Sequence, residues 1–507
     1  MEQPSVPPQP SDQPSDRPSD HLLEESILPT WLTQRPIGLW GFIWIWVGLA
    51  VVIVTFQYGA NGVEGGVTLP VVMAIVLTAT MTLAVVMTLT ADIGTEHGLS
   101  FAVYLRAPFG TIGTHLPSVS RGIVAACWFG IQTYLGALAI NGLVEYWTGF
   151  SSWPLWYAVF LVVQVINVAL GIKAIERLAA VAAPCILAIS LWMYFTLDGI
   201  AELEGANIWT FAGSGDTSLA ALFIVNMAVW APVSVDIPNI TRFVAAPSGE
   251  RRFLRRNRNI LIAQFVVLPV MQMWIAFIGA VSVIVTGNWN PIDVIQGEST
   301  GFVLGILLVM IVLAQWSTNT AANVVPAALN FVNALAPWLS YRYGVVMAGV
   351  VATAVMPWLL LDNLFTFLSY YGGFIAAIAG IMIAAFYLIR RRRLNVPHLF
   401  RSDGQYRYFR GVNPAALIAW GTASAAALFA LDYAYVIGFP IAFTVYLVLM
   451  RVWILPRFPQ EELSPSDPDD FLATSTGRSW VHDPGTGGFD LVPTDRLADR
   501  ATGREDI

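Results

Sequence analysis

The feature that most constrains this chain is a succession of long apolar runs separated by short polar breaks. Each run has the length of about 20 mostly apolar residues that a helix needs to cross a bilayer. The runs are continuously apolar rather than alternating at every second residue, which excludes a closed β-barrel. We therefore expect an all-α membrane protein of about twelve transmembrane helices. The runs lie near residues 37–58, 67–91, 118–147, 153–172, 177–197, 216–238, 260–285, 302–334, 342–361, 364–389, 413–431 and 434–455.

Charge is too sparse for a water-soluble protein of this size. Charged residues make up 12% of the 507 residues, whereas soluble domains carry about 25%. Lipid must therefore be the outer solvent. The flanking segments 1–35 and 457–507 are instead polar and rich in Pro, Ser, Gly and Asp. We expect both to be disordered cytoplasmic tails around a transmembrane domain over 36–456.

The placement of arginine predicts the orientation of the chain. Arginines cluster in the connections after even-numbered runs, as in 242–258 and 390–410, whereas the odd connections are neutral or acidic. Basic connections face the cytoplasm. The even connections and both termini are thus predicted to lie on the cytoplasmic side of the inner membrane, which requires an even number of helices.

Two runs carry interruptions at equivalent places. The first contains Gly38, Gly41 and Gly48, and the sixth contains Pro232 directly after Trp230 and Ala231. If runs 1–5 and 6–10 are two repeats, their odd length inserts the second copy upside down. A lone Gly or Pro is usually only a kink. Paired interruptions in inverted repeats, however, are typical of a binding site at the midplane of a secondary transporter.

Neutral polar side chains beside tryptophan are the candidate chemistry. Trp128 and Gln132 are four residues apart on one helix face, so an indole plane and an amide could meet one flat ring. Ser317 and Thr318 supply hydroxyl oxygens suited to a hard cation, and Asn323 supplies a second amide. The alternative is that these side chains only join helices or pack. The sequence carries none of the GxSxG, HExxH or phosphate-loop patterns, so we expect no enzyme.

Four stretches carry a family resemblance: RAPFG (106–110), CWFGIQTYLGALA (127–139), WSTNTAANVVPA (316–327), and RRRR with GQYRYFRGVN (390–393 and 404–413). The chain resembles the nucleobase:cation symporter-1 family, also called the purine/cytosine permease family, and most closely its bacterial hydantoin and allantoin sodium symporters. The resemblance implies a LeuT-type 5+5 inverted repeat plus two extra helices, with helices 1 and 6 broken.

The resemblance also implies the site. Two tryptophans would sandwich the substrate ring, two amides would bond its edge, and backbone beside the second tryptophan would contribute. By motif these positions are Trp128, Trp230, Gln132, Asn323 and Val229. Sodium would take carbonyl and hydroxyl oxygens at Gly48, Val51, Ala314, Ser317 and Thr318. The chain departs from the family at Val52, where the hydantoin member has a glutamine, and at Asn239, where many members carry an acid.

We therefore expect a cation-coupled symporter, with sodium favoured, that imports a planar nitrogen heterocycle such as a nucleobase, allantoin or hydantoin. It would act as a monomer in the lipid bilayer, without a further cofactor and without a nucleic-acid partner. Two alternatives stay open. One is a proton-coupled permease in which Asp236 takes the proton rather than pairing with cytoplasmic arginines. The other is a receptor that binds such a ring and transports nothing.

Overall fold

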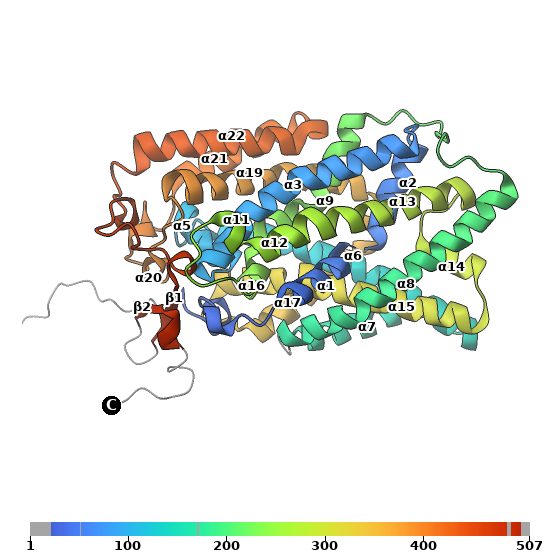
Figure 1. Cartoon of the computed structure of the whole chain (residues 1–507), viewed down its shortest axis with the longest axis horizontal. Coiled ribbons are helices and arrows are strands. Elements are labelled where there is room, and N and C mark those ends of the chain that lie inside the picture. Colours follow the sequence, from blue (N-terminus) through green and yellow to red (C-terminus); the bar gives the residue numbers. More distant parts are fainter. Residues whose placement is uncertain (1–21, 51, 170–171, 484–487, 498–507) are drawn as a thin grey trace, which may run out of the picture.

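The computed structural model describes residues 22–50, 52–169, 172–483 and 488–497, and most of them are helical. The long helices lie side by side along the longest axis of the molecule (Figure 1). The helices are α1 (Leu39–Ala50), α2 (Ile53–Glu64), α3 (Leu69–His97), α4 (Phe101–Tyr104), α5 (Arg106–Phe109), α6 (His115–Thr148), α7 (Trp153–Ala169), α8 (Ile172–Glu204), α9 (Leu219–Asp236), α10 (Pro238–Thr241), α11 (Phe253–Arg256), α12 (Arg258–Ile262), α13 (Leu268–Thr286), α14 (Pro291–Glu298), α15 (Gly301–Asn319), α16 (Val325–Leu335), α17 (Tyr341–Ala354), α18 (Pro357–Asp362), α19 (Leu364–Ile383), α20 (Val396–Leu399), α21 (Pro414–Leu428) and α22 (Ala434–Leu449).

Wider turns and short elements complete the fold. Four π-helical segments continue long helices, namely η4 (Ala263–Val267), η5 (Thr320–Val324), η6 (Ala384–Ile389) and η9 (Met450–Ile454). The 3-10 turns are η2 (Glu25–Ile27), η3 (Leu32–Gln34), η7 (Gln405–Arg407), η8 (Leu431–Tyr433), η10 (Glu461–Leu463) and η11 (Thr474–Thr476). Strands β1 (Arg478–His482) and β2 (Phe489–Pro493) pair antiparallel, with Trp480 opposite Leu491.

Every predicted apolar run corresponds to a helix or a short series of helices. Within the described residues, eight helices are long and apolar enough to cross a membrane, or nine when the bent pair α1–α2 counts as one span. The other runs form the shorter helices α7, α17 with α18, and α21. The predicted helical membrane architecture is confirmed.

The first run is interrupted as predicted. Helix α1 ends at Ala50 and α2 begins at Ile53, and the two helices are bent by 52°. Carbonyls in the last turn of a helix have no partner within it. The Thr55 hydroxyl donates to one of them, the carbonyl of Ala50, at 3.2 Å.

The sixth run is not interrupted in the way that the first run is. Helix α9 continues as one helix through Pro232, so an interruption there is not confirmed. Proline has no N–H to offer the carbonyl four residues earlier. That carbonyl belongs to Ala228 and accepts a hydrogen bond from the Tyr371 hydroxyl of α19 at 3.0 Å. The proline therefore frees a backbone acceptor without ending the helix.

Small residues bring α2 and α13 into backbone contact. A Cβ added to Gly59 would lie 1.7 Å from the carbonyl oxygen of Ala276, and one added to Gly279 would lie 2.0 Å from that of Phe56. No larger side chain fits at either position. Small residues at helix crossings allow this approach in membranes. The contact holds the second half of the broken span against α13.

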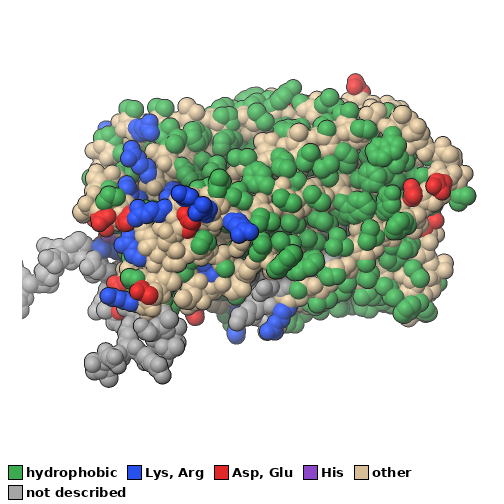
Figure 2. Space-filling view, viewed as in Figure 1, with side chains coloured by type: hydrophobic (Ala, Val, Ile, Leu, Met, Phe, Trp, Pro, Cys, Tyr) green, Lys and Arg blue, Asp and Glu red, His purple; other side chains and the backbone are tan. Residues whose placement is uncertain are grey.

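The surface has the pattern of a protein surrounded by lipid. Large apolar side chains such as Phe302 (77% exposed) and Val350 (64% exposed) point outward, and apolar side chains cover the middle of the face seen in Figure 2. Blue Lys and Arg side chains gather at the end that holds α11, α20, β1 and β2 (Figures 1 and 2). This separation of apolar flank and basic end agrees with the predicted membrane-spanning helices.

The prediction that 457–507 is disordered is wrong for the described parts, 457–483 and 488–497. Glu462 forms a buried ion pair with Arg390 at 3.3 Å. The backbone N–H and the hydroxyl of Ser475 donate to Glu96 at the end of α3, at 3.2 and 2.6 Å. A polar segment can be ordered without an apolar core of its own when it forms hydrogen bonds and ion pairs with buried side chains of the helical bundle. Composition alone does not reveal those partners.

The predicted N-terminal tail is also partly ordered. Residues 1–21 lie outside the described residues, but 22–35 pack against the basic end of the bundle. Ile27 is fully buried, and the Arg242 guanidinium donates to the carbonyls of Ser26 and Leu28 at 2.9 and 3.3 Å. Disorder is therefore a wrong prediction for 22–35.

Candidate functional site

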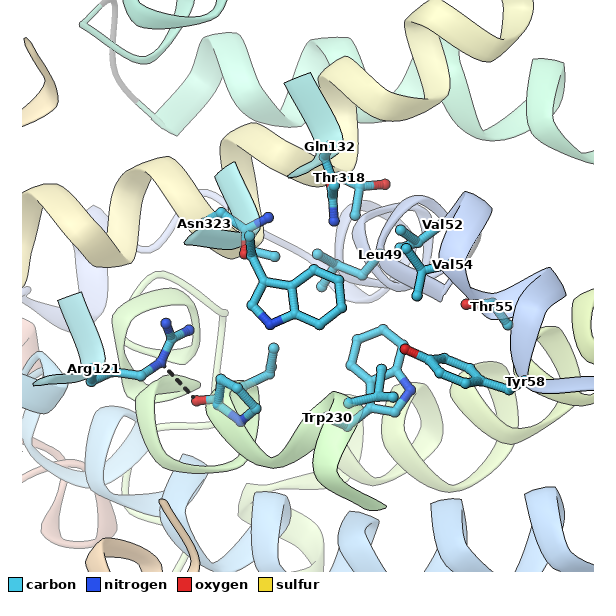
Figure 3. A pocket seen from close by; sticks show the side chains of 15 residues that line it. Leu49, Val52, Val54, Thr55, Tyr58, Arg121, Gln132, Trp230, Thr318 and Asn323 are labelled. Carbon is cyan, nitrogen blue, oxygen red and sulfur yellow. Dashed lines mark hydrogen bonds between the residues drawn. The ribbon is translucent and has the colours of Figure 1, made fainter. Parts of the chain in front are cut away.

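One cavity collects all the predicted substrate-binding positions. It lies between the α1–α2 break, α6, α9 and the junction of α15 with η5. Its free volume is about 40 Å³, which is room for a few water molecules. Figure 3 shows the side chains that converge on it. The predicted residues on its wall are Trp128, Gln132, Val229, Trp230 and Asn323.

Trp128 is held in place by a hydrogen-bonded chain that reaches α9. Its indole N–H donates to the Tyr371 hydroxyl at 3.2 Å, which in turn donates to the Ala228 carbonyl at 3.0 Å. The side chain is only 6% exposed. Because the N–H already has a protein partner, Trp128 presents its ring rather than its donor to the cavity.

Trp230 is fixed from behind in the same manner. Its indole N–H donates to Oε1 of Gln272 in α13 at 3.2 Å. Trp46 packs against it with ring centroids 5.9 Å apart and a 46° tilt. Both cavity tryptophans therefore offer π surfaces whose polar atoms are already bonded, which suits a flat ligand ring.

Gln132 brings an unpaired acceptor to the cavity. Its side chain is 3% exposed, and Oε1 has no hydrogen-bond partner among the described residues. A buried polar atom without a partner costs about 1–3 kcal/mol. A ring N–H bound beside it would remove that cost.

Asn323 is oriented by a polar network. It lies in the π segment η5, and its Nδ2 donates to Oδ1 of Asn319 at 2.9 Å. The Asn319 amide donates in turn to Gln164 in α7 at 2.7 Å and to the Phe129 carbonyl in α6 at 3.0 Å. π segments are frequent at functional sites. The network sets the direction of the Asn323 amide before any ligand is present.

Four of the predicted sodium ligands converge beside the cavity. The Thr318 hydroxyl bonds to the carbonyl of Gly48 and, at 3.1 Å, to that of Ala314. A Cβ on Gly48 would lie 3.2 Å from Oγ of Ser317, so this hydroxyl also adjoins the end of α1. The fifth predicted ligand, Val51, lies outside the described residues. The set consists of neutral oxygens, which fit a hard cation.

Sequence reasoning missed a charged residue in the cavity wall. Arg121 of α6 lines the cavity, forms an ion pair with Asp236 at 2.8 Å, and donates through Nε to the Pro232 carbonyl at 3.2 Å. Asp236 thus pairs within the bundle, not with the arginines that follow run six. The available signal was spacing, because Arg121 is two turns before Trp128 on the same helix face.

Other wall residues were only partly foreseen. Val52, identified as the position where a related glutamine is replaced, does line the cavity. Thr55 and Tyr58 of α2 also line it and lie at the opposite end from Arg121 (Figure 3). Neither was singled out by the sequence, since their approach depends on the bend between α1 and α2.

Sequence comparisons place these features in a known group. The family model described as a permease for cytosine/purines, uracil, thiamine and allantoin matches residues 31–453. The hydantoin permease of Microbacterium maritypicum is 30% identical over 460 residues, covering 89% of this chain and 93% of the relative. The allantoin permease of Bacillus subtilis (strain 168) is 26% identical over 484 residues, covering 85% and 94%.

Comparison with solved structures points to the same family as the sequence comparisons. The nucleobase-cation-symport-1 family transporter Mhp1, closed with bromovinylhydantoin bound, matches with a TM-score of 0.82 at 28% identity, covering 87% of this chain and 98% of that one. Its inward-facing conformation gives 0.78. A Na+-coupled sialic acid symporter shares the fold alone, with a TM-score of 0.58 at 12% identity. The predicted LeuT-type fold is confirmed.

One explanation accounts for three findings. These are the sequence match across nearly the whole membrane domain, the shared fold, and the cavity on which the predicted residues converge. The chain is a multi-pass membrane transporter rather than an enzyme. It belongs to the nucleobase-cation-symport-1 family of permeases for cytosine, purines, uracil, thiamine and allantoin, the cation-coupled symporters of nucleobase-like compounds.

Proposed function

We propose that this protein is a sodium-coupled symporter that imports a hydantoin, allantoin or nucleobase ring by alternating access. The observation that carries the proposal is the position of Thr318. Its side chain lines the ring cavity and also bonds to the Gly48 carbonyl at the end of α1. Substrate cavity and oxygen cluster therefore share one residue.

The ring would bind between the faces of Trp128 and Trp230. Gln132 would accept from a ring N–H through Oε1, which has no partner among the described residues, and Asn323 would bond the opposite edge. Hydantoins, allantoin, uracil and cytosine all present in-plane donors and acceptors on a flat ring. The relatives named for hydantoin and allantoin support this substrate class.

The ion would couple to the ring through the α1–α2 break. Sodium bound by the Gly48, Ala314, Ser317 and Thr318 oxygens would tie the end of α1 to α15, with the Val51 carbonyl as the proposed fifth ligand. Leu49 and Val52, which flank the break, line the ring cavity. If sodium binding orders the backbone between α1 and α2, the substrate meets an ordered cavity wall, and substrate binding in turn favours the sodium site. Coupling of this kind is reciprocal.

The cellular arrangement belongs to the same proposal. Arginines at the end that carries α11 and α20 support a cytoplasmic position for that end and for both termini in an inner membrane. The ring cavity and the oxygen cluster are built from one chain, so we propose a working monomer.

Uptake into proteoliposomes tests the proposal. Labelled uracil, cytosine, allantoin and 5-substituted hydantoins are offered with a sodium gradient, in choline buffer with a pH gradient, or with neither. We expect concentrative uptake of at least one compound with the sodium gradient alone. Uptake that follows the pH gradient and ignores sodium would identify the proton-coupled alternative. Binding without counterflow of labelled compound would identify a receptor.

A further inference from the structure

The motif GQYRYFRGVN at 404–413 contributes nothing to the ring cavity or to the oxygen cluster beside it. Its residues instead line a second cavity, at the basic end of the molecule, with a free volume of about 500 Å³. The opposite wall is formed by residues 457–459, which follow η9. The charged residues of the lining are Arg407, Arg410, Arg457 and Asp403. Positive charge therefore predominates in this cavity.

The positive charge of the second cavity lacks a protein counterion. The Asp403 carboxylate already accepts from the Arg401 guanidinium, with both contacts at 3.2 Å. The other three charged side chains, Arg407, Arg410 and Arg457, are exposed. They form no ion pair within the described residues. Three guanidinium groups are thus available to an anion from outside the protein.

A preformed turn holds the two arginines of the motif. They flank Tyr408 and Phe409 in the sequence. Tyr408 is buried, and its hydroxyl donates to the Ala107 carbonyl of α5 at 2.6 Å. Phe409 and Val412 exchange two backbone hydrogen bonds of 3.1 Å. The backbone of the turn is therefore ordered without a ligand, which lowers the entropic cost of binding one.

The second cavity lies at the end of a membrane-spanning helix. The apolar span ends at Ile454, and Arg457 follows it within about 5 Å at the rise of a helix. Trp453 packs against Phe409 with ring centroids 5.9 Å apart, and tryptophan is typical of the headgroup level of a bilayer. Lys and Arg side chains gather at the end of the molecule where α22 finishes (Figures 1 and 2). The arginines of the cavity are thus placed at the depth of lipid headgroups.

An exposed apolar strip leads along α22 toward the same cavity. It consists of Val448 and Val452, which are 51% and 76% exposed and four residues apart, and of Phe409 in the cavity wall, which is 42% exposed. Guanidinium groups bind phosphate well because their planar fork matches two phosphate oxygens. A phospholipid can place its phosphate among the arginines and its acyl chains on the strip. A soluble anion would leave the strip uncovered.

We propose that the second cavity binds the headgroup of an anionic phospholipid, with the acyl chains along the apolar strip. The proposal is independent of the ring site, and it takes from the proposed function only the assignment of this end to the cytoplasmic leaflet. Each arginine near an anionic lipid surface contributes about fivefold in affinity. Three arginines should therefore favour an anionic over a zwitterionic phospholipid by roughly 100-fold.

The test measures lipid binding to the purified full-length protein in a neutral detergent, where the two sides of the membrane play no part. The probes are palmitoyl-oleoyl phosphatidylglycerol, phosphatidylethanolamine with the same acyl chains, and inorganic phosphate. Bound lipid is counted by native mass spectrometry, and thermal unfolding is followed in parallel. We expect phosphatidylglycerol to bind roughly 100-fold more tightly than phosphatidylethanolamine and to raise the thermal midpoint. Equal binding of the two lipids would overturn the proposal, and so would inorganic phosphate that stabilises the protein as much as phosphatidylglycerol does.

A triple variant assigns the binding to the cavity. Arg407→Gln/Arg410→Gln/Arg457→Gln should bring the affinities for the two lipids to within a few-fold of each other. These side chains are exposed and form no ion pair in the described part of the chain, so the lipid-free thermal midpoint should stay close to that of the wild type. A preference for phosphatidylglycerol that survives the triple variant would refute the site. If the variant does not fold, the wild-type comparison of the probes still decides.

A charge-matched control separates the cavity from general surface charge. Arg252→Gln/Arg255→Gln/Arg258→Gln removes three exposed arginines of the same basic end that do not line the cavity. This variant should keep the preference for phosphatidylglycerol. Equal losses in the two triple variants would overturn the proposal. Trp128→Ala should leave lipid binding unchanged, so a failure of the ring site and a failure of the lipid site give different results.

Discussion

Replacing Trp128 by alanine is the most direct test of the ring site. The side chain is 6% exposed and forms a wall of the cavity. Its removal deletes the stacking surface but leaves the Tyr371 hydroxyl bonded to the Ala228 carbonyl. The backbone acceptor freed by Pro232 thus keeps its partner. The substitution should therefore lower the affinity for the ligand more than it lowers the stability of the fold.

The expected magnitude follows from stacking. An aromatic side chain under one base contributes about 1–3 kcal/mol, which corresponds to roughly 5- to 150-fold in Kd. Trp128→Phe keeps a smaller ring face and loses only the bond from the indole N–H to Tyr371. It should therefore weaken binding less than Trp128→Ala does.

The assay titrates purified protein with a hydantoin or nucleobase that the wild type binds, and thermal unfolding is measured in parallel. Trp420→Ala serves as the matched control, because Trp420 lies in α21 outside the cavity and its indole donates to the Phe374 carbonyl of α19 at 3.3 Å. Equal affinity in wild type and Trp128→Ala, with both proteins folded, would show that the indole does not form the binding platform.

Further predictions follow from other contacts. Gln132→Ala should weaken ring binding by about 1–3 kcal/mol, and ring N-methylated analogues should compete poorly with the parent compound; equal competition would rule out edge recognition. Thr318→Ala should raise the sodium concentration needed for half-maximal uptake and weaken substrate binding at subsaturating sodium, whereas an unchanged sodium dependence would exclude this residue from the ion site. Glu462→Gln leaves Arg390 buried without its carboxylate; loss of a buried partner costs about 3–5 kcal/mol, so the thermal midpoint should fall, and an unaltered midpoint would show that the C-terminal contact does not stabilise the fold.

The spans could be predicted because the bilayer sets their length. A run of about 20 apolar residues has few other uses in a protein, and every such run became helical. The residues of the ring cavity were predicted through motifs on α6, α9 and η5. Physical reasoning alone gave Trp128 and Gln132, which share a helix face, but not the approach of Trp230 from a distant segment.

What the sequence did not predict depends on partners distant in the chain. Ser475 is a polar residue in a polar segment, and only the buried carboxylate of Glu96 gives it a fixed place. Pro232 was expected to break its helix, yet the Tyr371 hydroxyl satisfies the Ala228 carbonyl and the helix continues. In each case local composition was read correctly, and a tertiary hydrogen bond determined the structure.

The ion pair between Arg121 and Asp236 bears on the choice of coupling ion. A proton taken up by Asp236 would neutralise the carboxylate that faces Arg121 at 2.8 Å, leaving a buried guanidinium uncompensated. Losing one partner of such a pair costs about 3–5 kcal/mol, and each transport cycle would have to supply it. A sodium ion among the neutral oxygens near Thr318 requires no such separation of charge. We therefore favour sodium, and we propose that the buried pair holds α6 against α9.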